Sequence, residues 1–184
     1  MTLTYIGIDP DTGDKQCPTV MAACERSAIH LETRDVYTVD DEVERFAAWK
    51  AGHRLDPNDR TSWWNDFHQM VSDAVGRGVA ARRARVVSEP VTDYIRFEHD
   101  GTFKNIAAGE SVRWLPRRLA SDLCVPCNDY WVFDERVVRL HHFSGDGQFL
   151  AEEWTEDPKI AKLCVSAFEA VWERGIDHAD YQPA

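Results

Sequence analysis

The segment from Arg82 to Glu98 concentrates the side chains best suited to binding or chemistry. Guanidinium, carboxylate and phenol groups alternate there with apolar residues, and our candidate ligand-binding residues are Arg85, Glu89, Asp93, Tyr94 and Arg96. The pattern predicts a strand end and a short turn into a helix, where open α/β sheets bring side chains and free backbone N–H groups together. Solvated ion pairs around a single turn are the alternative interpretation.

A second group of candidates, Glu32, Arg34 and Asp35, follows His30. Charges at a helix end commonly form an ion-pair network that fixes the direction of the chain, and a ligand-recognising corner is the alternative. Carboxylates of the two groups could divide acid and base work if burial separated their pKa values.

Cys124 and Cys127 form a C-x-x-C pair, a spacing that lets two thiolates converge on zinc or on each other. Completing a zinc site would need Cys17, Cys24 or scattered histidines, none of which has a matching second spacing. A strand follows the pair, whereas a redox couple usually gains its thiolate from a helix N-terminus. We interpret both as partly buried loop thiols and expect no metal and no cofactor.

Other familiar catalytic patterns are missing from the sequence. His141 and His142 lie in a predicted strand, so their rings point to opposite faces and cannot ligate one ion together. The sequence has no phosphate-binding glycine loop, no G-x-S-x-G elbow, no H-E-x-x-H and no EF-hand loop. We therefore assign no catalytic residues.

Hydrophobic spacing predicts the elements that position these residues. Helices are expected over 20–32, 41–51, 61–76 and 92–97, and strands over 81–88, 110–115, 130–133 and 136–143. A closing helix begins at Asp157 and Pro158, ends at Gly175, and includes Leu163 and Trp172 in its apolar stripe. The fold class is α/β (α+β), with N-terminal helices, a central mixed sheet and a closing helix, in one domain over 20–184 after a mobile lead-in over 1–19.

The amino-acid composition limits the kinds of molecule that this protein is expected to bind. The 184 residues include 32 acidic and 21 basic ones, a formal charge of -11, which repels phosphate backbones and argues against direct nucleic-acid binding. The acidic balance suits a basic protein partner, or simply solubility. No stretch of about 20 apolar residues and no signal-peptide pattern is present, so we expect a cytoplasmic protein that does not bind membranes. The five cysteines, an odd number, are expected to be free thiols.

Four blocks of the sequence resemble an uncharacterised actinobacterial family, a domain of unknown function often encoded beside helix-turn-helix regulators. The blocks lie at 30–37, 87–96, 109–117 and 129–134. The resemblance runs from about Val20 to Tyr181. It implies that the gene lies near that of a regulator, and it implies no mechanism. Cys124 and Cys127 depart from the plainer loop of that family.

The order of elements is also similar to one half of a phospholipase D fold. Such enzymes carry H-x-K-x-x-x-x-D, in which the histidine is the nucleophile and the lysine binds phosphate. If Asp134 is the final aspartate, these positions hold Cys127 and Asp129. The resemblance therefore implies a catalytically silent member. It also favours a homodimer, because single-half chains of this fold often pair.

We interpret the protein as a non-catalytic regulatory or ligand-sensing domain that binds a protein partner, a helix-turn-helix regulator, and a small molecule. The alternative is a hydrolase or transferase with an unfamiliar site of carboxylates and arginines. Five tryptophans are hard to place together in one small core, so we expect some of them at an interface. They are Trp63, Trp64, Trp114, Trp131 and Trp154.

Overall fold

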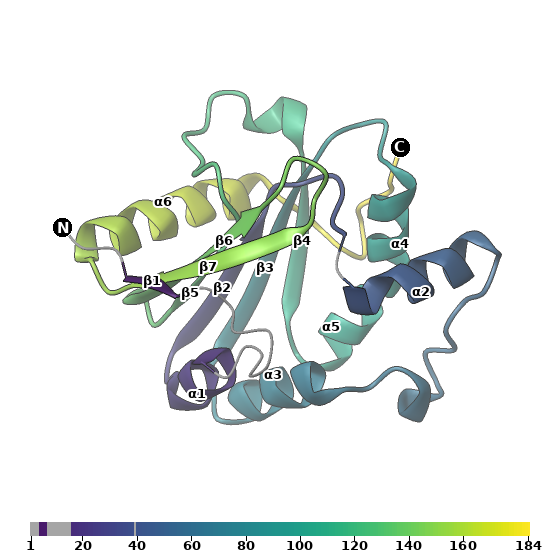
Figure 1. Cartoon of the computed structure of the whole chain (residues 1–184), viewed down its shortest axis with the longest axis horizontal. Coiled ribbons are helices and arrows are strands. Elements are labelled where there is room, and N and C mark those ends of the chain that lie inside the picture. The colour runs from purple at the N-terminus through teal and green to yellow at the C-terminus, as the bar shows by residue number, and fades with distance from the viewer. Residues whose placement is uncertain (1–3, 7–15, 39) are drawn as a thin grey trace.

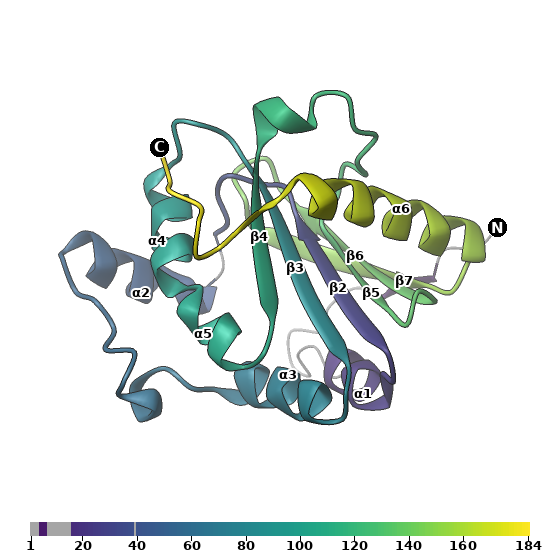
Figure 2. The ribbon, with the colours of Figure 1, turned by 180° about the vertical axis from the view of Figure 1, so that it is seen from behind.

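The computed structural model describes residues 4–6, 16–38 and 40–184, and within them an eight-stranded mixed sheet carries helices on both faces (Figures 1 and 2). The strand order is β1-β7-β6-β5-β2-β3-β4-β8. The strands are β1 (Thr4–Ile6), β2 (Ser27–Glu32), β3 (Ala80–Val87), β4 (Ser111–Pro116), β5 (Tyr130–Phe133), β6 (Val137–Phe143), β7 (Phe149–Thr155) and β8 (Ile176–Asp177). The neighbouring pairs β2–β3 and β3–β4 are parallel, and the other neighbouring strands of the described sheet are antiparallel.

Six α-helices connect and cover these strands within the described residues. They are α1 (Gln16–Ala23), α2 (Asp40–Lys50), α3 (Asp66–Gly76), α4 (Asp93–Gly101), α5 (Phe103–Ala107) and α6 (Pro158–Arg174). Short 3-10 turns at Arg60–Ser62 and Arg117–Ala120 complete the set. None of these helices is long and apolar enough to cross a membrane.

Helix α6 covers one face of the sheet, as Figure 2 shows. Its buried Phe168 and Val171 pack against Ile29 and Leu31 of β2 and against Val86 of β3. Side chains alternate between the two faces of a strand, so these apolar positions leave their neighbours pointing to the opposite face.

Two separate apolar clusters cover that opposite face. Near the start of β2 and β3, helices α1 and α3 bury Met21 and Val71 against Phe133 of β5. Near the ends of β3 and β4, α4 buries Ile95 beside Trp114, which has no exposed surface. The sheet residues between these clusters are polar, and they form the candidate site described below.

The predicted helix over 20–32 is wrong after Ala23, because Ser27–Glu32 forms β2 at the centre of the sheet. Ala28, Ile29 and Leu31 are all buried, since α-helices cover both faces of this strand. Strands buried on both faces read as continuous apolar runs, which a short window does not distinguish from one face of a helix. Helix α1 also begins earlier than predicted, at Gln16; residues 1–3 and 7–15 of the expected lead-in lie outside the described residues.

The third helix begins later than predicted, after Asn65 and not at residue 61. The Asn65 side chain accepts a hydrogen bond from the His68 backbone N–H at 3.1 Å, and His68 Nδ1 accepts one from the Asn65 N–H at 3.3 Å. This reciprocal pair satisfies two backbone donors at the helix start. Trp63 and Trp64 therefore lie in the preceding turn and not on the helix.

The strands over 81–88, 110–115, 130–133 and 136–143 are confirmed to within a residue. The hairpin between β5 and β6 turns at Asp134 and Glu135, whose φ angles of 50° and 59° are typical of a two-residue hairpin turn. Strands β7 and β8 were not predicted. Acidic residues interrupt the apolar pattern of β7, and β8 is too short to leave a pattern.

Two expectations about packing are wrong. On α6, Leu163 is 56% exposed and Trp172 is only half-buried, so the core stripe of this helix is narrower than predicted. Four of the five tryptophans that we expected to be difficult to bury are nonetheless buried within the single chain. They are Trp63, Trp114, Trp131 and Trp154.

Candidate functional site

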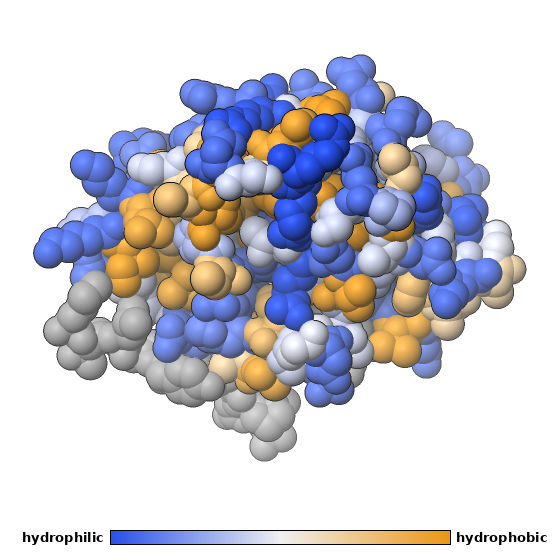
Figure 3. All heavy atoms as spheres, turned by 90° about the horizontal axis from the view of Figure 1, so that it is seen from above, coloured by the Kyte–Doolittle hydropathy of each residue, from blue (hydrophilic) through white to orange (hydrophobic). Residues whose placement is uncertain are grey.

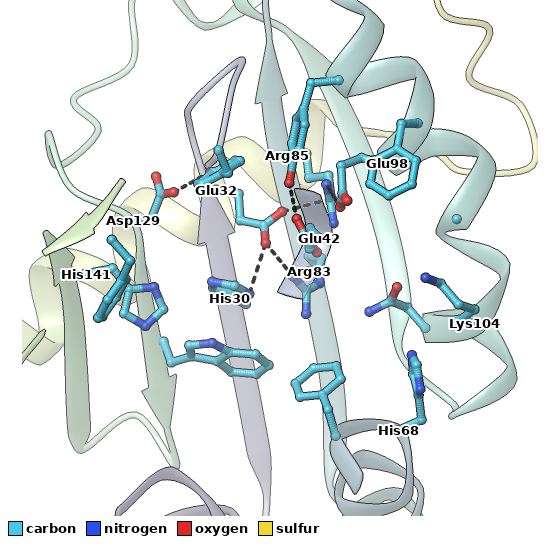
Figure 4. Close-up of a pocket in the computed structure, with 18 of the residues that line it drawn as sticks. His30, Glu32, Glu42, His68, Arg83, Arg85, Glu98, Lys104, Asp129 and His141 are labelled. Carbon is cyan, nitrogen blue, oxygen red and sulfur yellow. Dashed lines mark hydrogen bonds and ion pairs between the residues drawn. The ribbon is translucent and has the colours of Figure 1, made fainter. Parts of the chain in front are cut away.

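A cavity of about 330 Å³ lies on the polar part of the sheet face, between the two apolar clusters (Figure 4). Strands β2, β3, β5, β6 and β7 and Asp129 supply one wall, while α2, α3, α4 and α5 supply the other. Its size is at the lower end of the range for small-molecule pockets, which is about 300–1,000 Å³.

Strand register brings the polar residues of the sheet together. His30 of β2 lies opposite Arg83 of β3, and Glu32 lies opposite Arg85. On the other side of β2, Trp131 of β5 pairs with His30. Alternate residues of a strand point to the same face of the sheet. His30 and Glu32 of β2 and Arg83 and Arg85 of β3 therefore all point into the cavity.

Glu32 occupies the centre of an ion-pair network. Its Oε1 accepts a hydrogen bond from Arg83, and its Oε2 lies 2.8 Å from Nε of Arg85. Arg83 Nε also contacts Glu110 at 3.1 Å, and Arg85 contacts Glu98 at 2.6 Å. Burial raises the pKa of Glu32, and the two guanidinium groups oppose that rise. Each arginine of this network therefore has two carboxylate partners inside the protein.

Two neutral imidazoles lie beside this network. His30 stacks on Trp131 with ring centroids 4.3 Å apart, and His141 meets the edge of His30 at 5.7 Å. Burial lowers the pKa of both histidines well below the ordinary value, so both are uncharged at neutral pH. His30 Nδ1 lies 3.5 Å from Glu32 Oε1.

Three buried nitrogens of these imidazoles make no hydrogen bond to the part of the chain that the structure describes: Nδ1 and Nε2 of His30 and Nε2 of His141. A buried polar atom left without a partner costs on the order of 1–3 kcal/mol. A bound molecule in the cavity that reaches these nitrogens would recover that cost.

Asp129 lies at the edge of the cavity, directly before β5. Its carboxylate accepts hydrogen bonds from the backbone N–H and hydroxyl of Thr33, both at 2.8 Å, and from the hydroxyl of Tyr37. Burial raises the pKa of Asp129, while these hydrogen bonds counteract the rise. Asp129 is therefore a buried acid that accepts several hydrogen bonds.

The helical wall carries Lys104 and His68. Burial lowers the pKa of Lys104, and it lowers that of His68 to about 4. Glu42 of α2 accepts a hydrogen bond from the Tyr94 hydroxyl. This hydrogen bond connects α2 and α4.

The structure separates the residues proposed from the sequence. Glu32, Arg85 and Tyr94 line the cavity. Arg34 and Asp35 line a different depression, at the carboxyl ends of β2 and β3. Hydrophilic and hydrophobic residues are mixed on this face of the molecule (Figure 3).

The remaining three candidates lie outside both depressions. Glu89 accepts a hydrogen bond from the Tyr181 hydroxyl at 3.3 Å, and Arg96 donates one to the Pro183 carbonyl at 3.2 Å. Asp93 is exposed in the first turn of α4. These groups support the C-terminal segment and the helix start, and they do not converge with Glu32.

Sequence reasoning missed most of the polar residues of the cavity. The missed residues are His30, Arg83, Glu98, Lys104, Asp129, Arg139 and His141. A signal for four of them is present in the sequence, because His30, Arg83, Arg139 and His141 are polar residues at alternate positions of largely apolar strands. Recognising it requires the strand assignment of β2, which was predicted as a helix.

The C-x-x-C pair lies away from this cavity. Cys124 and Cys127 are exposed free thiols, not the partly buried ones expected, and Cys127 borders the depression that contains Arg34. In the described residues, no group of three histidines, cysteines or carboxylates is arranged to hold a metal ion.

Comparison with known proteins supports the fold described above. Nuc from Salmonella typhimurium, a phospholipase D family member, is similar with a TM-score of 0.56 and 12% identity over 96% of this chain and 97% of that chain. NucT from Helicobacter pylori is similar with a TM-score of 0.57 and 9% identity over 96% and 98% of the two chains. A search of curated protein sequences gave no significant match. These structural matches show a phospholipase D-like fold, and a family model covers residues 15–183: the chain belongs to the family described as a domain of unknown function, DUF6879.

Proposed function

We propose that this protein is a non-catalytic ligand-sensing domain, and that its ligand is a small molecule bound in the cavity beside His30. The observation that carries the proposal is the presence of buried, unpartnered nitrogens on His30 and His141. Paired residues around them hold the site in place without a ligand, which is the preorganisation expected of a binding pocket.

Several features argue against phosphodiester hydrolysis of the phospholipase D type. If Asp134 is the final aspartate of the motif, the positions of the nucleophile and the phosphate-binding lysine hold Cys127, which is exposed, and Asp129, which is buried. The carboxylate of Asp129 would repel a phosphodiester. Arg83 and Arg85 are already paired with glutamates, so neither guanidinium is available without breaking an existing ion pair.

For partners, we propose that ligand binding alters contacts with a second protein, a helix-turn-helix regulator, and that the domain acts as a homodimer in the cytoplasm. The net charge of -11 suits a basic partner. The contact between Glu42 and Tyr94 offers a route by which an occupied cavity could shift the outer helix α2. Co-purification of the regulator, and sedimentation at several concentrations, test these two claims separately.

The cavity itself is tested by native mass spectrometry of the protein purified from its host. We expect a retained small molecule that is lost on denaturation and absent from His30→Phe, which fills space and removes the nitrogen. His142→Phe is the matched control, because His142 lies on the opposite face of the sheet and pairs with Glu153 at 3.2 Å. No retained molecule in any preparation, together with no ligand-induced rise in melting temperature, would contradict the proposal.

A hydrolase or transferase remains the second candidate, and one observation favours it. The carboxylate of Glu32 lies 3.5 Å from His30 Nδ1 without a hydrogen bond to it, and His30 Nε2 is unpartnered, so the neighbouring acid could orient this histidine as a base or nucleophile. Turnover of a phosphodiester or ester that disappears in both His30→Gln and Glu32→Gln, with folding intact, would establish this function in place of the first.

A further inference from the structure

The cavity has two chemically different ends. Figure 4 shows His30 and His141 toward one side, Lys104 and His68 toward the other, and Arg83 between them. The first end offers neutral imidazole nitrogens and the second an ammonium group. A ligand that uses both ends must therefore combine an uncharged polar group with a negative one.

Lys104 is the cavity's available cation. Its ammonium makes no hydrogen bond or ion pair with any residue that the structure describes, whereas Arg83 and Arg85 each contact two glutamates. Glu98 and Glu42 act on Lys104 only at longer range, and burial disfavours its charge. A single anionic group on the ligand would restore the missing partner.

A second negative charge is disfavoured at the imidazole end. Glu32 lies 3.5 Å from the His30 ring, and the buried carboxylate of Asp129 also lines the cavity. Two like charges placed close together in a poorly solvated site raise each other's cost of ionisation. Phosphate monoesters and polyphosphates, which carry two or more charges at neutral pH, therefore fit this cavity poorly.

The body of the ligand faces aromatic rings. Phe67 and Trp131 meet with centroids 6.4 Å apart, and the Arg83 guanidinium lies 5.9 Å and 5.6 Å from their respective ring centroids. Phe97 and Phe143 also line the cavity. Flat apolar surfaces favour a planar partner, and about 330 Å³ suits one or two rings better than a dinucleotide.

We propose that the cavity binds a small aromatic or heteroaromatic monocarboxylic acid, with its carboxylate on Lys104 and an uncharged polar group toward His30 and His141. This inference rests on the proposed sensing function and adds the class of ligand.

The experiment compares matched probes on the intact chain by isothermal titration calorimetry. The probes are 4-hydroxybenzoate and indole-3-carboxylate, their uncharged amides, 4-hydroxyphenyl phosphate and inorganic phosphate. We expect the carboxylates to bind at least about tenfold more tightly than the amides, because a charge-assisted contact contributes roughly 1.5–3 kcal/mol. Lys104→Gln should remove this preference by weakening the binding of the carboxylates more than that of the amides, whereas Lys104→Arg should retain it.

Lys162→Gln is the charge-matched control, since Lys162 is exposed on α6 on the other side of the sheet. Equal binding of acids and amides, tighter binding of the phosphates, or an unaltered acid preference in a folded Lys104→Gln protein would overturn the inference. If no probe binds while native mass spectrometry still finds a retained molecule, the ligand class is wrong and the sensing function stands. If neither experiment finds a ligand, both fail.

Discussion

Asp134 should stabilise the fold through the hairpin between β5 and β6. Its carboxylate accepts hydrogen bonds from the backbone N–H groups of Glu25, Arg26 and Ser27 at 3.0, 2.7 and 3.0 Å, which fixes the start of the central strand β2. These bonds lower the pKa of Asp134 to about 2 from its ordinary 3.8, although partial burial opposes the change. Asp134 therefore has a structural role in this chain.

The magnitude follows from that pKa. A fall from 3.8 to about 2 corresponds to roughly 2.4 kcal/mol of preference for the ionised form in the folded state. Solvent screens a half-buried carboxylate, so we expect Asp134→Asn to lower the free energy of unfolding by about 1–2 kcal/mol at neutral pH. The folded-state pKa is the lower one, so this stability is present above about pH 4 and is lost as the pH falls through 2.

Urea unfolding of the wild type and of Asp134→Asn, followed by tryptophan fluorescence at several pH values from 7 to 3, measures the effect. The difference between the two proteins should be about half as large at pH 3 as at pH 7. Glu135→Gln is the control, because it removes the same charge from the adjacent, exposed turn residue. A cost no larger than that of the control, or a difference that does not change with pH, would refute the role assigned to the carboxylate.

Three further predictions concern packing and reactivity. Gly109→Ala should cost about 2–3 kcal/mol in urea unfolding, because Gly109 has φ +95° and an added Cβ would lie 2.8 Å from a valine methyl group. Phe168→Ala should cost about 3–5 kcal/mol, and Trp172→Ala clearly less, because the phenylalanine is fully buried and the tryptophan only half-buried. A thiol reagent applied to the native protein should react rapidly with Cys124 and Cys127, which are the exposed cysteines of the described residues.

Each of these three predictions has a control within the same protein. Gly78→Ala, at φ +100° with nothing within 4 Å, isolates the backbone cost, and an equal loss at Gly109 would contradict the steric argument. Equal losses at Phe168 and Trp172 would contradict the burial assigned to α6. Burial raises the pKa of Cys24 and Cys164 to about 11, so rapid labelling of either thiol in the folded protein would contradict their placement.

The closing helix and the hairpin between β5 and β6 could be predicted because the residues at their ends are typical of a helix start and of a tight turn. Asp157 and Pro158 open α6, and the side chain of Asp157 accepts a hydrogen bond from the Lys159 N–H at 2.8 Å, as an N-cap should. The two-residue turn at Asp134 and Glu135 was equally local. Both signals depend on a few neighbouring residues and not on the rest of the fold.

The site was less predictable because it depends on register between distant strands. His30 and Trp131 are separated by 101 positions and become partners only when β2 pairs with β5. Nothing near His30 in the sequence indicates this partner. Of the arginines and acids that line the cavity, the sequence pointed to Arg85 and Glu32 but not to Arg83, Glu98 or Asp129, since the helices that cover them cannot be inferred from a single strand.

The ends of the sheet have a consequence for how the chain behaves in solution. β1, with three residues, pairs with β7, and β8, with two, pairs with β4. Both strands are too short to offer a long row of free backbone groups to another molecule, which limits edge-to-edge aggregation. A chain shortened past Ile6 would lose this protection along β7. We expect such a chain to be less soluble than the full one, because the edge of β7 would offer free backbone groups to a second molecule.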